Sequence, residues 1–208
     1  MSRPEGRFDE RYYREVCGEQ QTRFDRARDH RVVRMLRRHA DPSGALLDVG
    51  CGYGHLLARF VDRYDLFGVE LSDHAAGRAR ARGVHVVRAD VQRPLPFTRR
   101  FAAVVAVNVI EHLEDPGAAI RGIADVLLPY GVCVVHLPTI NNPVSRAIYR
   151  VAYAKDPTHI YRPDGREVRA LFEAAGFLTF EESYAPHSRW LLSNLRWHPA
   201  YLAAFARP

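Results

Sequence analysis

Residues 45–54 read Ala-Leu-Leu-Asp-Val-Gly-Cys-Gly-Tyr-Gly, an apolar run that leads directly into a glycine-rich turn. The run Ala45–Val49 has the length and composition of a buried strand. The glycines after it let the main chain turn tightly and approach a bound molecule without a Cβ clash. A helix is predicted to follow at His55–Arg63, with the positive end of its dipole facing the turn. This pattern predicts a small-molecule site at the carboxyl end of the strand.

Strands and helices alternate beyond this turn. Further strands are predicted at Leu66–Glu70, Val84–Arg88, Phe101–Asn108 and Gly131–Leu137, with helices at Asp73–Arg82 and Pro116–Leu128 between them. Such alternation predicts an α/β fold with a mostly parallel sheet and right-handed crossovers.

Two more strands are predicted near the end of the chain, and helices are predicted on either side of the alternating core. The strands are Phe177–Tyr184, with Phe177 and Phe180 facing inward, and Ala200–Ala206, and they would form an antiparallel edge of the sheet. The helices are one or two within residues 8–39, and one each at residues 145–153, 164–175 and 190–196.

Composition limits the class of protein. The chain has 208 residues, a net charge of +6 and three cysteines, which fits one domain in a reducing cytoplasm. No apolar run approaches the roughly 20 residues that span a bilayer, and the charged N-terminus has no apolar signal region. Of the 30 basic residues, only Lys155 is a lysine. The arginines either reflect a GC-rich genome and solvated helix faces or serve an anionic acceptor. No nucleic-acid-binding motif accompanies them.

Acidic and amide side chains follow the predicted strands. Asp48 lies one residue before the end of the first strand, Glu70 ends the second and Asn108 the fourth, and Asp90 follows the third. The carboxyl ends of parallel strands meet at one edge of an open sheet, where ligands bind. A carboxylate at Glu70 is placed to accept hydrogen bonds from both hydroxyls of a ribose, and Asp90 to accept one from an adenine amino group.

In this order the motifs resemble the class I S-adenosylmethionine (SAM)-dependent methyltransferases, in particular the small-molecule type 11 or 12 group. The matching stretches are LLDVGCGYGHLL, FGVELS, RADVQRPLPF, VNVIEHLEDP and HIYRPDGREVRALFEAAGF, which cover residues 45–177. The resemblance implies a Rossmann-like sheet of seven strands in the order 3-2-1-4-5-7-6, with strand 7 antiparallel and helices on both faces. One domain would then comprise an N-terminal helical arm or lid (1–40), a SAM-binding half (45–137) and an acceptor-binding loop with the sheet edge (138–208).

The resemblance also implies which residues contact SAM. Gly50, Gly52 and Gly54 would pack against its methionine part, with Asp48 nearby. Glu70 would bind the ribose, Asp90 and Val91 the adenine, and the backbone of Asn108 the methionyl end. Cys51 and Leu71 are further expected cofactor contacts. In the arm, Tyr12 or Tyr13 would close the site, with Tyr13 the preferred contact, or both tyrosines would only pack the arm onto the sheet.

Two histidines are the candidate catalytic residues. An O- or N-acceptor needs a nearby base, and histidine is the usual one near neutral pH. His112 follows the fourth strand, and His159 lies in the long loop after the fifth. Either one serves as base, or His112 has a structural or SAM-side role and His159 lines the acceptor pocket. Glu111 is expected to cap or pair near a helix. The spacing of His112, Asp115 and His136 does not require a metal, and no metal is expected.

The function predicted from these features is SAM-dependent O- or N-methylation of a small molecule such as a glycan, a nucleotide sugar or a natural-product intermediate. The alternatives are a catalytically silent SAM-binding partner subunit and an NAD-dependent oxidoreductase. The turn reads G-x-G-x-G rather than the G-x-G-x-x-G of dinucleotide sites, which disfavours the oxidoreductase. No nucleic-acid or membrane partner is expected, and a monomer and a homodimer are both compatible with the sequence.

Overall fold

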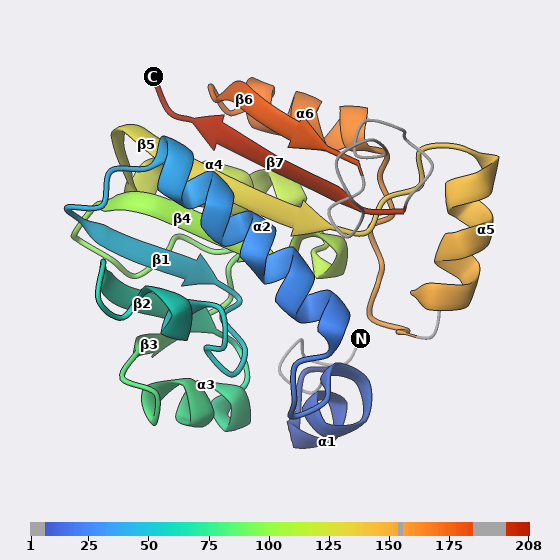
Figure 1. The fold of residues 1–208 in the computed structure, drawn as a ribbon, viewed down its shortest axis with the longest axis horizontal. Coiled ribbons are helices and arrows are strands. Elements are labelled where there is room, and N and C mark those ends of the chain that lie inside the picture. Colours follow the sequence, from blue (N-terminus) through green and yellow to red (C-terminus); the bar gives the residue numbers. More distant parts are fainter. Residues whose placement is uncertain (1–6, 154–155, 185–198) are drawn as a thin grey trace.

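The computed structural model, which describes residues 7–153, 156–184 and 199–208, is built on one seven-stranded sheet (Figure 1). Its strand order is β3-β2-β1-β4-β5-β7-β6, as predicted. The strands are β1 Ala45–Val49, β2 Asp65–Glu70, β3 His85–Arg88, β4 Phe101–Val107, β5 Leu127–Leu137, β6 Leu178–Ser183 and β7 Tyr201–Ala206. β1 to β5 are parallel, and β7 runs antiparallel to β5 and β6. The predicted α/β class and the antiparallel edge are therefore confirmed.

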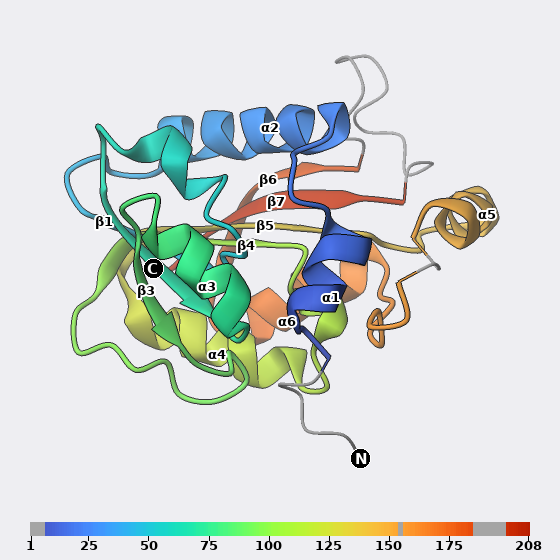
Figure 2. The ribbon, with the colours of Figure 1, turned by 90° about the horizontal axis from the view of Figure 1, so that it is seen from below.

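Helices cover both faces of the sheet. They are α1 Glu10–Tyr12, α2 Arg23–His39, α3 Asp73–Arg80, α4 Pro116–Val126, α5 Pro143–Ala152 and α6 Gly165–Ala174. α2 lies on one face, while α4 and α6 lie on the other (Figure 2). The short α1 and the outlying α5 both lie beyond the carboxyl ends of the parallel strands (Figure 1). Across the described residues, no helix is both long and apolar enough to cross a membrane.

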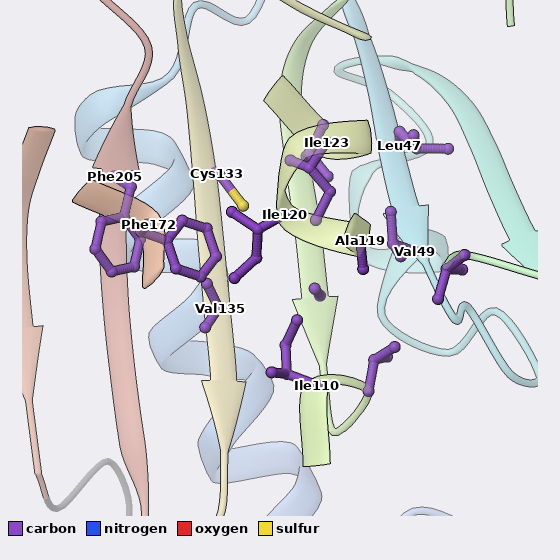
Figure 3. Close-up of a cluster of buried hydrophobic side chains, with 14 of the residues drawn as sticks. Leu47, Val49, Ile110, Ala119, Ile120, Ile123, Cys133, Val135, Phe172 and Phe205 are labelled. Carbon is purple, nitrogen blue, oxygen red and sulfur yellow. The ribbon is translucent and has the colours of Figure 1, made fainter. Parts of the chain in front are cut away.

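Buried apolar clusters lie on both sides of the sheet because most residues of the central strands are apolar. On the face covered by α4 and α6, Ile120 and Ile123 pack against side chains of β1 and β4 (Figure 3). Toward the edge, the ring of Phe172 stacks on Phe205 with centroids 4.1 Å apart. The parallel strands are thereby held rigidly, so the polar residues at their ends have fixed positions.

Three expectations need correction. The segment predicted as a helix at His55–Arg63 contains only a 3₁₀ turn, Leu57–Phe60. Its backbone hydrogen bonds join residues three apart at some positions and four apart at others, so no regular α-helix forms. β5 begins at Leu127, four residues earlier than predicted. Phe180 is 57% exposed, because an irregularity between Thr179 and Glu181 turns its side chain outward. The helix predicted at residues 190–196 lies outside the described residues.

The N-terminal region forms two helical segments. α1 and a π-helical turn at Tyr13–Cys17 make up a short arm, which ends at Gly18 with φ +72°. α2 then begins in a capping box, in which the Thr22 side chain accepts from the Asp25 backbone and the Asp25 carboxylate accepts from the Thr22 backbone. This reciprocal cap fixes the first turn of α2 beside the site described below.

Replacing Thr22 with alanine is expected to lower the free energy of unfolding by about 1 kcal/mol, because an orphan backbone donor loses its acceptor. Urea denaturation measures this value. Thr22→Ser is the matched control, since it keeps the hydroxyl and is expected to unfold like the parent chain. An equal loss in both variants would contradict a capping role.

Candidate cofactor and acceptor site

A cavity of about 940 Å³ opens at the carboxyl ends of β1 to β4. Its size suits a drug-sized ligand. The predicted residues that line it are Tyr13, Asp48, Gly50, Cys51, Gly52, Glu70, Leu71, Asp90, Val91, Asn108, His112 and His159. Gly54 does not line it; a Cβ added at Gly54 would lie 3.1 Å from Ala79 Cβ, so this glycine allows α3 to pack closely instead. The predicted cofactor and acceptor residues otherwise border one common space.

The glycine turn is held in shape by β2. The backbone amides of Gly50 and Cys51 both donate to the Val69 carbonyl, at 2.8 and 3.0 Å. Gly50 has φ +73°, a conformation that favours glycine, and an added Cβ would lie 2.5 Å from Val109 Cγ2. The turn therefore needs glycine at position 50 on two independent grounds.

The Glu70 carboxylate organises the same turn. One of its oxygens accepts from the Gly52 amide at 2.9 Å and the other from the Ser72 amide at 2.8 Å. Burial raises the pKa of Glu70, although these two amides and the Tyr13 hydroxyl oppose the rise. A buried acceptor with this geometry suits neutral hydroxyl donors such as those of a ribose.

A second acidic group lies behind the turn, and sequence reasoning found only part of it. Burial raises the pKa of Asp48 well above its usual range, and the nearby carboxylates Asp29 and Glu70 add to the rise. Asp29 is itself fully buried, and Arg28 binds it at 2.9 Å and Asp25 at 3.0 Å. Arg28, Asp29 and Asp25 all line the cavity. In the sequence, only the spacing of these three charged residues on α2 indicates that they interact. The same spacing is common on solvent-exposed helix faces, so it does not predict a site.

The remaining predicted cofactor residues lie on the turns after β3 and β4. Asp90 accepts a hydrogen bond from the Gln92 amide at 3.0 Å, which fixes its carboxylate at the cavity beside Val91. Asn108 has φ +55°, and its side-chain oxygen lies 2.7 Å from His136 Nδ1. Asparagine tolerates this left-handed conformation better than most residues, so the side chain holds the turn while the main chain borders the cavity.

The arm closes one side of the cavity. Tyr13 is buried and lies over Gly52, while its hydroxyl reaches Glu70. The Tyr12 hydroxyl donates to Asp156 Oδ2 at 3.0 Å, in the loop that follows β5. The two tyrosines thus connect the arm to both ends of the cavity, as expected of a segment that covers the site.

The two candidate catalytic histidines meet at the far end of the cavity. Their ring centroids are 4.8 Å apart. The approach of His159 follows from a backbone bond, in which the Tyr161 amide donates to the Glu111 carbonyl at 2.9 Å. His112 Nδ1 lies 3.2 Å from the Thr158 carbonyl, and His159 Nδ1 lies 3.0 Å from the Tyr149 hydroxyl. The long loop is therefore fastened onto the turn after β4.

Burial dominates the protonation of this histidine pair. It lowers the pKa of His112 to about 4, with a further lowering from His159. It also lowers the pKa of His159, against the opposing charge of Asp156. Both rings are therefore neutral near pH 7, and each has one nitrogen able to offer a lone pair.

Glu111 does not cap a helix as expected, because Asp115 caps α4 instead. Its side chain is 1% exposed, and neither carboxylate oxygen has a hydrogen-bond partner among the described residues. His112 Nε2 lies 4.0 Å from Glu111 Oε1. Burial raises the pKa of Glu111 to about 8. A carboxylate this deeply buried and unsatisfied requires an explanation.

Asn141, Asn142 and Tyr184 do not line this cavity. Asn142 caps α5, and the Asn141 side chain contacts Thr139 and the Gly165 amide, so both serve the turn. Tyr184 packs on Tyr201 at the sheet edge. The two tryptophans, Trp190 and Trp197, lie outside the described residues.

A family model described as a methyltransferase domain matches residues 19–181, so the chain belongs to this family. The predicted class, the SAM-dependent methyltransferases, is thereby confirmed, and with it S-adenosylmethionine as the cofactor of the family.

Two curated relatives and one solved structure illustrate the similarity. A dTDP-3-amino-3,4,6-trideoxy-alpha-D-glucopyranose N,N-dimethyltransferase of Streptomyces venezuelae is 33% identical over 111 residues, which is 50% of this chain and 46% of that one. A ubiquinone biosynthesis O-methyltransferase of Dinoroseobacter shibae is 29% identical over 78% of this chain and 73% of its own. A SAM-dependent methyltransferase from Thermotoga maritima, described as a possible histamine N-methyltransferase, shares the fold with a TM-score of 0.69, 21% identity and coverage of 89% and 90%. The chain spans about half the length of several curated relatives that it matches.

Proposed function

We propose that this chain transfers the methyl group of SAM to an oxygen or nitrogen atom of a small molecule. The proposal rests on one cavity that is bordered by two different groups of residues. One wall is the glycine turn with Glu70, and the other is the histidine pair with Asp156. A cofactor held by the first wall would present its reactive end toward the second.

The cofactor would lie across the strand ends. Glu70 would bind the ribose hydroxyls, and Asp90 with Val91 would bind the adenine. The methionine part would follow the turn at Gly50 and Gly52, near Asp48. Cys51, Leu71, Asn108 and Tyr13 would complete the contacts, while Gly54 would support the turn from outside the cavity. Arg28 is the cationic group nearest the acids at this end, and we assign to it the carboxylate of the methionine part, because an arginine fork suits a carboxylate.

Methyl transfer from a sulfonium is an in-line displacement, and alignment supplies most of the rate. The acceptor atom must lie roughly 3–3.5 Å from the methyl carbon. His112 and His159 are the proposed catalytic residues because they line the acceptor end and keep neutral rings. Closure by the arm would exclude water while the charge of the sulfonium disperses.

The acceptor is proposed to be small and uncharged or cationic. The names of the relatives give a dTDP-linked amino sugar, which is anionic through its diphosphate, and a step of ubiquinone biosynthesis, so they do not decide the charge of the acceptor. Of the two lining arginines, Arg7 is paired with Glu114 and Arg28 is assigned above to the methionine carboxylate, which leaves little support for an anionic acceptor. A cytoplasmic location and the choice between monomer and homodimer stay predictions.

Calorimetry with SAM, S-adenosylhomocysteine and NAD tests the proposal directly. Binding of the first two without NAD is expected, and binding of NAD alone would favour the oxidoreductase. Incubation with labelled SAM and a panel of amino sugars and phenols then tests for catalysis. Tight SAM binding without transfer to any acceptor would favour the silent partner subunit.

Arg28→Lys is expected to weaken SAM binding about fivefold to tenfold, because lysine keeps the charge and loses the two-pronged hydrogen bonding. Calorimetry measures the change. Arg34→Lys is the matched control, since Arg34 lies exposed on the same helix and does not line the cavity. Equal affinities in the two variants would contradict the role assigned to Arg28.

A further inference from the structure

The unsatisfied Glu111 carboxylate belongs to a cluster of potential metal ligands. One donor atom from each of Glu111, His112 and His159 lies within 4.8 Å of the other two. The side chains of all three are at least nine-tenths buried. A cation between them would compensate a buried carboxylate that otherwise has no hydrogen bond among the described residues.

The histidines are oriented as metal-binding histidines are. Such a histidine uses one ring nitrogen for the metal and donates the other N–H to a fixed acceptor. His112 Nδ1 faces the Thr158 carbonyl at 3.2 Å, and His159 Nδ1 faces the Tyr149 hydroxyl at 3.0 Å. The other ring nitrogen of each histidine lies near a carboxylate. His112 Nε2 is 4.0 Å from Glu111 Oε1, and His159 Nε2 is 3.6 Å from Asp156 Oδ2.

We propose that Glu111, His112 and His159 bind one divalent transition-metal cation at the acceptor end of the cavity. Two imidazoles and one carboxylate form a donor set that suits zinc and similar cations. Zinc bonds of about 2.0–2.2 Å place tetrahedral donors about 3.4 Å apart, so donor atoms that now lie within 4.8 Å of one another need to approach by about 1.4 Å at most. This assignment replaces the expectation of no metal, which considered His112 with Asp115 and His136.

The position of the cluster gives the cation a role toward the acceptor, and this role rests on the proposed function. His112 and His159 line the cavity, whereas Glu111 does not, so the open coordination position faces the acceptor. The site selects an oxygen acceptor. An amine bound to the cation would have its only lone pair occupied, whereas a bound oxygen keeps lone pairs for attack.

Methyl transfer to the bound oxygen combines the loss of one proton with one displacement at the methyl carbon. Before the arm closes, the coordinated hydroxyl releases its proton to solvent water, since a cation lowers the pKa of a bound hydroxyl. An oxygen lone pair forms the bond to the methyl carbon, the carbon–sulfur bond breaks, and its electron pair stays on sulfur. The products are the methyl ether and S-adenosylhomocysteine, and the cation keeps its charge throughout.

Zinc titration of the chelator-treated full chain tests the site without any reaction. Calorimetry with zinc chloride is expected to show one cation per chain. The variants Glu111→Gln, His112→Gln and His159→Gln are each expected to weaken binding by more than about 100-fold, beyond what loss of a supporting hydrogen bond costs. Tyr149→Phe removes only such a support and is expected to weaken binding about tenfold.

His55→Gln is the matched control, because His55 lines the cavity near the glycine turn and lies outside the cluster. Cobalt(II) absorption, intense for a four- or five-coordinate cation, gives a second readout on the unaltered chain if a variant unfolds. No binding by the unaltered chain, or binding that survives all three ligand substitutions, would overturn the proposal. SAM calorimetry on the same samples keeps the two proposals apart, since zinc binding without SAM binding would remove only the proposed function.

Discussion

Glu70→Gln is expected to weaken SAM binding about 10- to 150-fold, which corresponds to the roughly 1.5–3 kcal/mol of hydrogen bonds to a charged group. The carboxylate accepts two donors at once, and an amide offers only one oxygen. Part of the loss is expected to come from the glycine turn itself, because an amide leaves one of the Gly52 and Ser72 N–H groups without its acceptor. Calorimetry gives the affinity, and thermal unfolding without ligand checks the fold.

Asp73→Asn is the control for Glu70. Asp73 begins α3, three residues away, and its side chain is 73% exposed in an ion pair with Arg88. SAM affinity should be unchanged in this variant. If Glu70→Gln also leaves the affinity unchanged, the ribose is bound elsewhere and the assignment of the glycine turn loses its main support.

Gly50→Ala is expected to lower the free energy of unfolding by about 2–5 kcal/mol. The left-handed backbone costs an alanine about 1–2 kcal/mol, and the contact with Val109 adds about 1–3 kcal/mol of overpacking. An added Cβ would lie 2.5 Å from Val109 Cγ2, and both residues border the cavity. Urea denaturation is expected to show the loss, and SAM affinity should fall with it.

Gly77→Ala is expected to change the free energy of unfolding in the opposite direction, although it also replaces glycine with alanine. Gly77 lies within α3 and has nothing within 4 Å of an added Cβ. Alanine there should raise the free energy of unfolding by about 0.5–1 kcal/mol, because it restricts the unfolded chain and suits a helix. If the two alanine variants unfold alike, the strained turn at Gly50 is not a structural requirement.

The features that follow from periodicity and strand order were predictable from the sequence. Continuous apolar runs such as Phe101–Val107 identify strands that are buried on both faces, and the glycine turn shows where the first of them ends. Once those strands are parallel, Glu70 and Asp90 must lie at one edge of the sheet, so their shared cavity follows from topology.

The features that depend on packing between distant segments were not predictable. The approach of His159 to Glu111 depends on one backbone bond from Tyr161, made by a loop with no periodic pattern. Arg28 faces the cavity only because α2 is capped at Thr22 and lies on β5 and β7. Phe180 points outward because of a local irregularity in β6. The alternation of apolar and polar residues in this strand does not predict that irregularity.

The two adjacent tyrosines of the arm have a kinetic consequence. Tyr13 reaches the carboxylate at the ribose end, and Tyr12 reaches the loop that carries His159. Under the proposed function, cofactor exchange is expected to require movement of this segment. We then expect the cofactor to bind before the acceptor, and departure of the demethylated product to limit turnover.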